Sequence, residues 1–233
     1  MRMADTLFLD FEGEGPKGPD RVPQLPFLAG LYRPKAEGRK SQFSVSLFRE
    51  YCTPVKNGIP EISEITTLEA FIERVTGQAE TEGLTICYWS KYELDVLKDF
   101  LKSNSSLVER FTKISLNAKL AAKTYLNRLG RKVPKSEKKK LNAFLSAVCP
   151  EATPVSVPPL GAAESCRRLE RHSLKEKKWS RWTSEQKSVA TELVRYNRED
   201  CFATAKIMRH LPADSMRGKS RDSSVVPPPD TEA

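Results

Sequence analysis

The chain opens with alternating apolar and polar positions, the pattern of a β-strand. Leu7, Leu9 and Phe11 fall on one face of the predicted strand, because successive side chains of a strand point to opposite sides. Asp10 and Glu12 fall side by side on the opposite face, just before a glycine-containing turn. Neighbouring like charges repel unless a partner offsets them. We therefore expect a half-buried strand whose end is a candidate functional site.

The patterns farther along the chain predict a mixed α/β fold. Strands are predicted at residues 25–34, 41–50 and 84–89, and helices at residues 66–83, 90–103, 115–130, 136–148 and 183–211. Three strands in succession predict a meander, and the later strand between helices predicts parallel pairing. The expected organisation is one domain, 1–211, with a helical basic insertion at about 105–182, followed by a disordered tail at 212–233.

The composition shows an excess of basic residues and indicates which cellular compartment to expect. The 39 basic residues against 30 acidic ones give a net charge of +9, which suits a polyanionic partner. The five cysteines include no CxxC pair, which favours a reducing, cytoplasmic setting over a disulfide framework or a zinc site. No apolar run approaches the roughly 18 residues of a membrane helix, so no membrane association is expected.

The helix predicted at 183–211 carries an acid on its apolar face. Tyr196 and Ile207 belong to an apolar stripe at helical spacing, and Asp200 lies on this stripe. Glu199, the neighbouring acid, lies on the polar side of the helix. Burying a lone carboxylate is costly unless it is paired or bound to a metal, so Asp200 is a candidate functional residue.

The helix predicted at 90–103 repeats this arrangement with Glu93, which shares a face with Leu97 and Phe100. Two explanations are open for this acid. Ser90 and Glu93 have the spacing of a capping box, in which the glutamate binds the first amide of the helix. Alternatively, Glu93 is a functional acid that faces the core.

Two acids on one strand face and one inward-facing acid on each of two helices would repel strongly if they converged. Divalent cations would offset this repulsion, and carboxylate oxygens suit Mg²⁺ or Mn²⁺. Two such ions about 3.5–4 Å apart can activate a water and stabilise the leaving oxygen of a phosphodiester. Asp10, Glu12, Glu93 and Asp200 are therefore a candidate site for two metal ions.

These motifs resemble those of the DEDD (DnaQ-like) 3′–5′ exonuclease superfamily. Asp10 and Glu12 match its Asp-x-Glu motif in "LFLDFEG". Tyr196 and Asp200 match the Tyr-x-x-x-Asp motif of its tyrosine (DEDDy-type) subclass in "YNREDC". In the second motif, "YWSKYE" has Glu93 where the superfamily usually has aspartate. This variant is similar to the RecB-associated RNase H-like nuclease domains.

The resemblance covers about residues 5–104 and 183–211. It implies a ribonuclease H-like fold, two Mg²⁺ or Mn²⁺ ions and a 3′–5′ exonuclease that acts on single-stranded DNA or RNA. By resemblance, the four acids ligate the ions directly or through water, and Tyr196 orients the attacking water. A tyrosine that packs on the sheet is the alternative for Tyr196, while Phe11 and Tyr92 are expected to be packing residues.

Two other functions stay open. The first is a catalytically weakened module that binds nucleic acid or a partner protein, since Glu93 departs from the usual motif. The second is an endonuclease.

Basic residues crowd the segment between the second and third motifs. Trp179 and Trp182 lie among those of its second half. Cations near aromatic side chains suit a channel for single-stranded nucleic acid, whereas a solvated helical face with two core tryptophans is the alternative. The candidate nucleic-acid-binding residues are Arg131, Lys132, Lys138, Lys139, Lys140, Arg167, Arg168, Lys177, Lys178 and Arg181.

Overall fold

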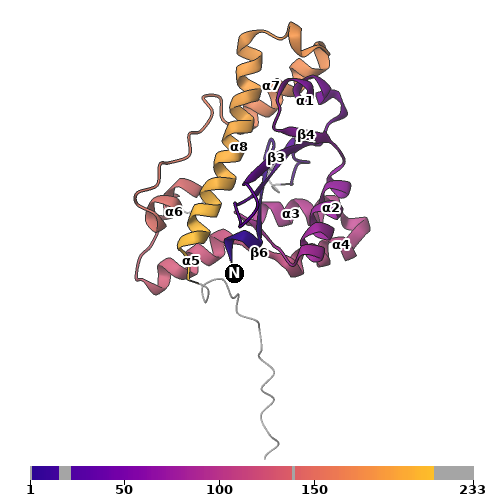
Figure 1. Cartoon of the computed structure of the whole chain (residues 1–233). Helices are drawn as coiled ribbons and strands as arrows, with labels where there is room; N and C mark the ends of the chain where they lie inside the picture. The colour runs from indigo at the N-terminus through magenta and orange to yellow at the C-terminus, as the bar shows by residue number, and fades with distance from the viewer. Residues whose placement is uncertain (1, 16–21, 138–139, 213–233) are drawn as a thin grey trace, which may run out of the picture.

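The structure, a computed structural model, describes residues 2–15, 22–137 and 140–212. A six-stranded mixed sheet lies at its centre, with helices on both faces (Figure 1). The strands are β1 (Thr6–Glu12), β2 (Leu28–Arg33), β3 (Gln42–Leu47), β4 (Ile62–Ile65), β5 (Thr85–Tyr88) and β6 (Ser115–Asn117). The helices are α1 (Thr53–Gly58), α2 (Leu68–Glu82), α3 (Lys91–Phe100), α4 (Ser105–Ile114), α5 (Ala118–Arg128), α6 (Leu141–Val148), α7 (Ala162–Lys175) and α8 (Ser184–His210). Except for Pro212, the predicted disordered tail lies outside the described residues.

The strand order across the sheet is β4-β3-β2-β1-β5-β6. β1, β2 and β3 form the predicted antiparallel meander. β5 pairs in parallel with β1, β6 pairs in parallel with β5, and β4 pairs in parallel with β3 at the other edge. The predicted mixed α/β class is confirmed, and the arrangement is compatible with a ribonuclease H-like sheet.

β1 is buried on both faces, which corrects the expectation of a half-buried strand. Leu7, Leu9 and Phe11 pack into a core with residues of α2, α3 and α4. Phe8, on the opposite face, packs into a second core with residues of α5, α6 and α8. Helices cover both faces of this central strand, and strands in that position read as nearly continuous buried runs.

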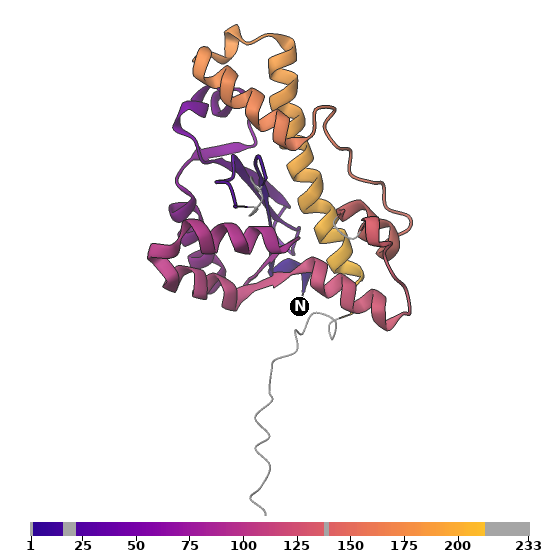
Figure 2. The same ribbon diagram turned by 180° about the vertical axis from the view of Figure 1, so that it is seen from behind.

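α8 dominates the second face of the sheet. Its residues belong to two cores, one shared with α5 and α6 and the other with α1 and α7. Figure 2 shows α8 running beside the sheet between these two groups of helices. Thr183 and Gln186 form the predicted capping box at its beginning, so the sequence marks where the helix starts.

The other helices agree with the sequence patterns at some ends and differ from them at others. Thr67 caps α2 and Gly83 ends it in the left-handed conformation, at φ 64°, as the pattern predicts. The predicted helix at 90–103 ends earlier, at Phe100, and the helix predicted at 136–148 begins only at Leu141. The shorter α6 follows a 3-10 turn, Lys135–Glu137.

Two edge strands differ from the predictions. Residues 115–117 form β6, paired with β5, although the pattern predicts a helix there. The Asn117 side chain then accepts a hydrogen bond from the Leu120 amide at 2.9 Å and starts α5. The patterns did not predict β4. Strands of three and four residues are too short for alternation to distinguish them from neighbouring structure.

Within the described part of the chain, no helix combines the length and apolar character needed to cross a membrane. All five cysteines are buried free thiols.

Candidate metal centre

Three of the four predicted acids converge where β1 ends beneath α8. One carboxylate oxygen from each of Asp10, Glu12 and Asp200 lies within 4.8 Å of the others. Asp10 and Glu12 are only 9% and 7% exposed, and Asp200 keeps a partly exposed side chain. The three acids are therefore a candidate metal centre. Among the described residues, one other group brings three possible ligands this close: Cys149, Glu151 and His210.

The alternation of side chains in β1 and the helical spacing in α8 bring the three acids to facing sides of these two elements. The two acids of β1 share the face that packs against α8. Asp200 lies on the inner side of α8, one residue before Cys201, which is 1% exposed and lies against the β1 and β2 backbones. Glu199 lies on the outer side and accepts a hydrogen bond from the Ser156 amide at 3.1 Å. The sequence therefore separated the inward-facing acid from its neighbour correctly.

Burial and mutual repulsion make these carboxyls hold protons more tightly than usual. Desolvation raises the pKa of Asp10, and the charges of Glu12 and Asp200 raise it further. Desolvation also raises the pKa of Glu12, with Asp200 adding to the rise. Burial raises the pKa of Asp200 from 3.8 to about 7. A divalent cation at this position would replace the protons and remove the repulsion.

Tyr196 lies one turn before Asp200 on α8. Burial and the nearby charge of Asp200 raise the pKa of Tyr196, so its hydroxyl keeps its proton at neutral pH. Tyr196 also packs against the core beneath α8. The packing agrees with the alternative that the sequence left open, and the predicted role in orienting a water stays a prediction.

Glu93 forms the capping box that the sequence left open. The Ser90 amide and hydroxyl donate to Glu93 Oε2 at 3.2 Å and 3.0 Å. The carboxyl is only 3% exposed, and burial raises its pKa from 4.5 to about 7, with Asp200 contributing. Glu93 is not in the three-acid group, yet its charge raises the pKa values of Asp10 and Glu12. Its part in metal binding stays a prediction.

Asn197 is the site residue that sequence analysis missed. Its Nδ2 donates to Asp10 Oδ2 at 2.7 Å and to the Asp10 carbonyl at 3.2 Å, and the side chain is fully buried. These bonds hold the Asp10 carboxylate in one orientation. Asn197 lies three residues before Asp200, and residues at this spacing share a helix face. A polar residue on the buried face of "YNREDC" was therefore a detectable signal.

Gly30 makes room for this asparagine. Gly30 lies opposite Asp10 in the pairing of β1 with β2, and a Cβ added to it would lie 1.8 Å from Asn197 Oδ1. Any larger residue at position 30 would have to displace the side chain that orients Asp10.

We expect Gly30→Ala to lower the free energy of unfolding by about 1–3 kcal/mol, the usual effect of an inserted methyl in a packed core. Chemical denaturation measures this change. Gly77→Ala is the matched control, because nothing lies within 4 Å of a Cβ added at that helical position, and alanine there adds helix stability. Equal unfolding midpoints for wild type and Gly30→Ala would show that Asn197 does not pack as described.

Phe11 and Tyr92 are packing residues, as expected. Phe11 is 5% exposed, and Tyr92 packs beside it in the same core. The Tyr92 hydroxyl also donates to the Gln24 carbonyl at 3.4 Å. Neither residue belongs to the three-acid group.

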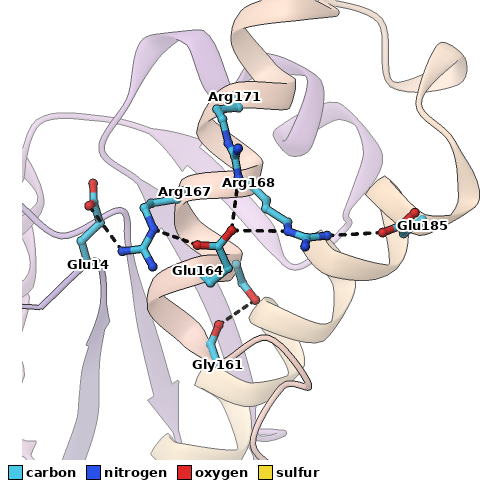
Figure 3. Close-up of polar contacts among 8 residues, drawn as sticks. Glu14, Gly161, Glu164, Arg167, Arg168, Arg171 and Glu185 are labelled. Atoms are coloured by element: carbon cyan, nitrogen blue, oxygen red, sulfur yellow. Dashed lines mark hydrogen bonds and ion pairs between the residues drawn. The ribbon is translucent and has the colours of Figure 1, made fainter.

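The predicted basic residues on α7 form ion pairs around Glu164 (Figure 3). Arg167 lies 2.9 Å from Glu164 and also approaches Glu14 at 3.8 Å. Arg168 pairs with Glu164 at 3.4 Å and with Glu185 at 3.3 Å. The arginines lower the pKa of Glu164, Arg167 most strongly. Their charge is partly neutralised within the protein, which weakens the case that α7 binds phosphates.

Of the other predicted basic residues in this segment, Lys177 and Arg181 have partners nearby in the chain, and the two tryptophans pack. Lys177 Nζ donates to the Ser173 carbonyl at 2.8 Å, and Arg181 approaches Glu176 at 3.8 Å. Lys178 is exposed. Trp182 is 3% exposed, and its indole donates to the Glu176 carbonyl at 3.0 Å. Trp179 packs beside it, with ring centroids 5.1 Å apart, so both tryptophans pack, and the role of this segment in nucleic-acid binding stays a prediction.

The predicted basic residues before α6 lie in a different environment. Arg131 and Lys132 line a cleft beside α5. Lys140 pairs with Glu137 at 2.8 Å. Lys138 and Lys139 lie outside the described residues.

Comparisons with known proteins add no identification. The findings that stand are the mixed α/β fold and an acidic cluster, formed by Asp10, Glu12 and Asp200, that could hold a metal. No protein-family model matches the chain, and the comparison with curated proteins gives no match either.

Proposed function

We propose that this protein is a metal-dependent nuclease that hydrolyses phosphodiester bonds, acting as a 3′–5′ exonuclease on single-stranded nucleic acid. The observation that carries the proposal is the three-acid group of Asp10, Glu12 and Asp200, with Tyr196 one helical turn before Asp200. The order of the motifs along the chain, which resembles the DEDD exonucleases, adds the direction of cleavage and the strand preference.

The donor set fits hard divalent cations. All three close ligands are carboxylates, which suit Mg²⁺ or Mn²⁺ better than softer metals. Burial and mutual repulsion raise their pKa values, and a divalent cation would relieve this repulsion. Asp10, Glu12 and Asp200 would hold the ions directly, and Glu93 would hold one through a water. When bound, two such ions supply a water activated at neutral pH and charge stabilisation at the leaving oxygen.

The residues of the chain supply orientation in this proposal. Asn197 fixes the Asp10 carboxylate by two hydrogen bonds. Tyr196, one turn before Asp200, keeps its proton at neutral pH and would orient the attacking water. Tyr196 therefore acts as a positioning residue.

The test is cleavage of end-labelled single-stranded DNA and RNA with Mg²⁺ or Mn²⁺. The proposal predicts stepwise release of mononucleotides from the 3′ end and no reaction in EDTA. A strand with a blocked 3′ end should resist cleavage. If the blocked strand is cut internally, the protein is an endonuclease. If no strand is cut although both bind, the protein is a nucleic-acid-binding module with a weakened site.

We expect Tyr196→Phe to lower kcat about 10- to 100-fold and to leave KM unchanged. In the proposal the hydroxyl makes one hydrogen bond in the charged site, and such bonds contribute about 1.5–3 kcal/mol. Steady-state cleavage rates measure the effect, while Mn²⁺ should still raise the melting temperature as in wild type. Tyr125→Phe, on α5 away from the acids, is the control. Full activity in Tyr196→Phe would leave Tyr196 as a packing residue only.

A further inference from the structure

The cleft beside α5 is the strongest uncommitted site in the described structure. It has a volume of about 530 Å³, within the range of ligand sites. Its apolar lining comes from Leu126, Val133 and Phe144, which belong to the core shared with α8. Its remaining lining residues are Lys119, Lys123, Asn127, Arg131, Lys132 and Pro134.

The charge of the lining selects the kind of occupant. Four of the lining residues are basic and none is acidic. Within the described part of the chain, Lys123, Arg131 and Lys132 form no ion pair, in contrast to the arginines around Glu164. A cleft that combines several cations with an apolar floor suits a ligand with phosphates and a flat, weakly polar body. A nucleotide of a polynucleotide has both parts.

Helix α5, which lines the cleft, begins at the edge of the sheet where β1 carries its acids. β1, β5 and β6 run in parallel, so their carboxyl ends meet at one edge of the sheet. The Lys119 amide donates to the Trp89 carbonyl at 3.1 Å, and the next residue, Ser90, holds Glu93. α5 extends from this edge for 11 residues, a length of about 16 Å. A strand lying along α5 could therefore end at the acids.

We propose that this cleft is the binding site for the single-stranded segment upstream of the cleaved end. Lys123, Arg131 and Lys132 neutralise its phosphates, and the apolar floor takes a base. No base-specific group is implied, so binding is independent of sequence. The proposal rests on the proposed nuclease function for its choice of strand and direction.

The test is binding of a fluorescent 12-nucleotide single strand, as DNA and as RNA, to the full chain with Ca²⁺ in place of Mg²⁺. The double variant Lys123→Ala/Arg131→Ala should bind about tenfold more weakly. The slope of log K against log salt should fall by about 1.4, because each phosphate contact in a single strand contributes about 0.7. The control double variant Lys56→Ala/Lys98→Ala removes the same charge from exposed positions and should bind as wild type does.

The outcomes separate this inference from the nuclease proposal. Unchanged affinity and salt slope in the cleft variant overturn the cleft, even if wild type cleaves the strand. Weakened binding in the cleft variant supports the cleft, even if wild type cuts nothing in Mg²⁺ or Mn²⁺, and that result overturns the nuclease alone. Equal losses in the cleft and control variants also overturn the cleft, because net charge alone would then explain them. A difference in affinity between the DNA strand and the RNA strand shows which of the two the cleft prefers.

Discussion

The Asp10→Asn variant is expected to lose nuclease activity by at least about 10³-fold, which corresponds to about 4 kcal/mol of transition-state stabilisation. The amide keeps the shape of the side chain and can still accept the hydrogen bond from Asn197 Nδ2. It removes one anionic ligand from the three-acid group. The loss should therefore come from metal binding and not from a damaged fold.

Stability measurements distinguish these two causes. In EDTA at neutral pH, Asp10→Asn should unfold at a higher denaturant concentration than wild type, because it removes a buried ionisable group whose charged form Glu12 and Asp200 repel. In wild type, Mn²⁺ at 100 times its Kd should add about 2.7 kcal/mol of stability, and the variant should gain much less. Asp95→Asn, an exposed acid on α3 paired with Lys91, is the control. An active Asp10→Asn protein would overturn the proposed site.

The second large effect is expected for Glu93→Gln, which decides between the two explanations for this residue. Glutamine at this position also completes a capping box with Ser90, so the start of α3 is preserved. If Glu93 binds an ion through water, activity should fall about 10- to 100-fold, as it does when groups that contact a metal's ligands, and not the metal itself, are changed. Full activity in the variant would make Glu93 a capping residue alone.

The same variant has an expected pH signature in the absence of metal. Burial raises the pKa of Glu93 from 4.5 to about 7. Because the folded state holds this proton more tightly than the unfolded state, the protonated group adds to the free energy of unfolding. This contribution is fully present below pH 4.5 and is lost as the pH rises through about 7. As the pH rises between these values, the free energy of unfolding of Glu93→Gln should therefore rise relative to that of wild type by up to about 3 kcal/mol. Denaturation in EDTA across this range measures the difference, and a difference independent of pH would contradict the burial of a charged Glu93.

Local sequence signals predicted the elements that carry the site. Thr67, Gly83 and Thr183 have the residue types that helix ends require, and each lies at a helix end in the structure. The alternation in β1 and the helical stripe around Asp200 placed these acids on inward faces. Such signals depend on interactions within a few residues, so one segment is enough to read them.

Other features depended on partners far away in the chain. Alternation suggested that β1 was half-buried, because nothing in one segment shows that α8 covers its second face. β6 became a strand because β5 offers it a parallel edge. The basic residues looked alike in sequence, yet those around Glu164 are held in ion pairs while others line a cleft.

The sequence by itself determined the mixed α/β class, several helix ends and a set of four candidate acids, three of which come together. Only the tertiary structure decided that Asn197 orients Asp10, that Gly30 leaves space for it and that Glu93 lies in a capping box outside the three-acid group. The physical reason is the separation along the chain over which each kind of interaction acts. Periodicity and capping act between neighbours along the chain, whereas close packing and carboxylate repulsion act between segments that meet only when the sheet and α8 assemble.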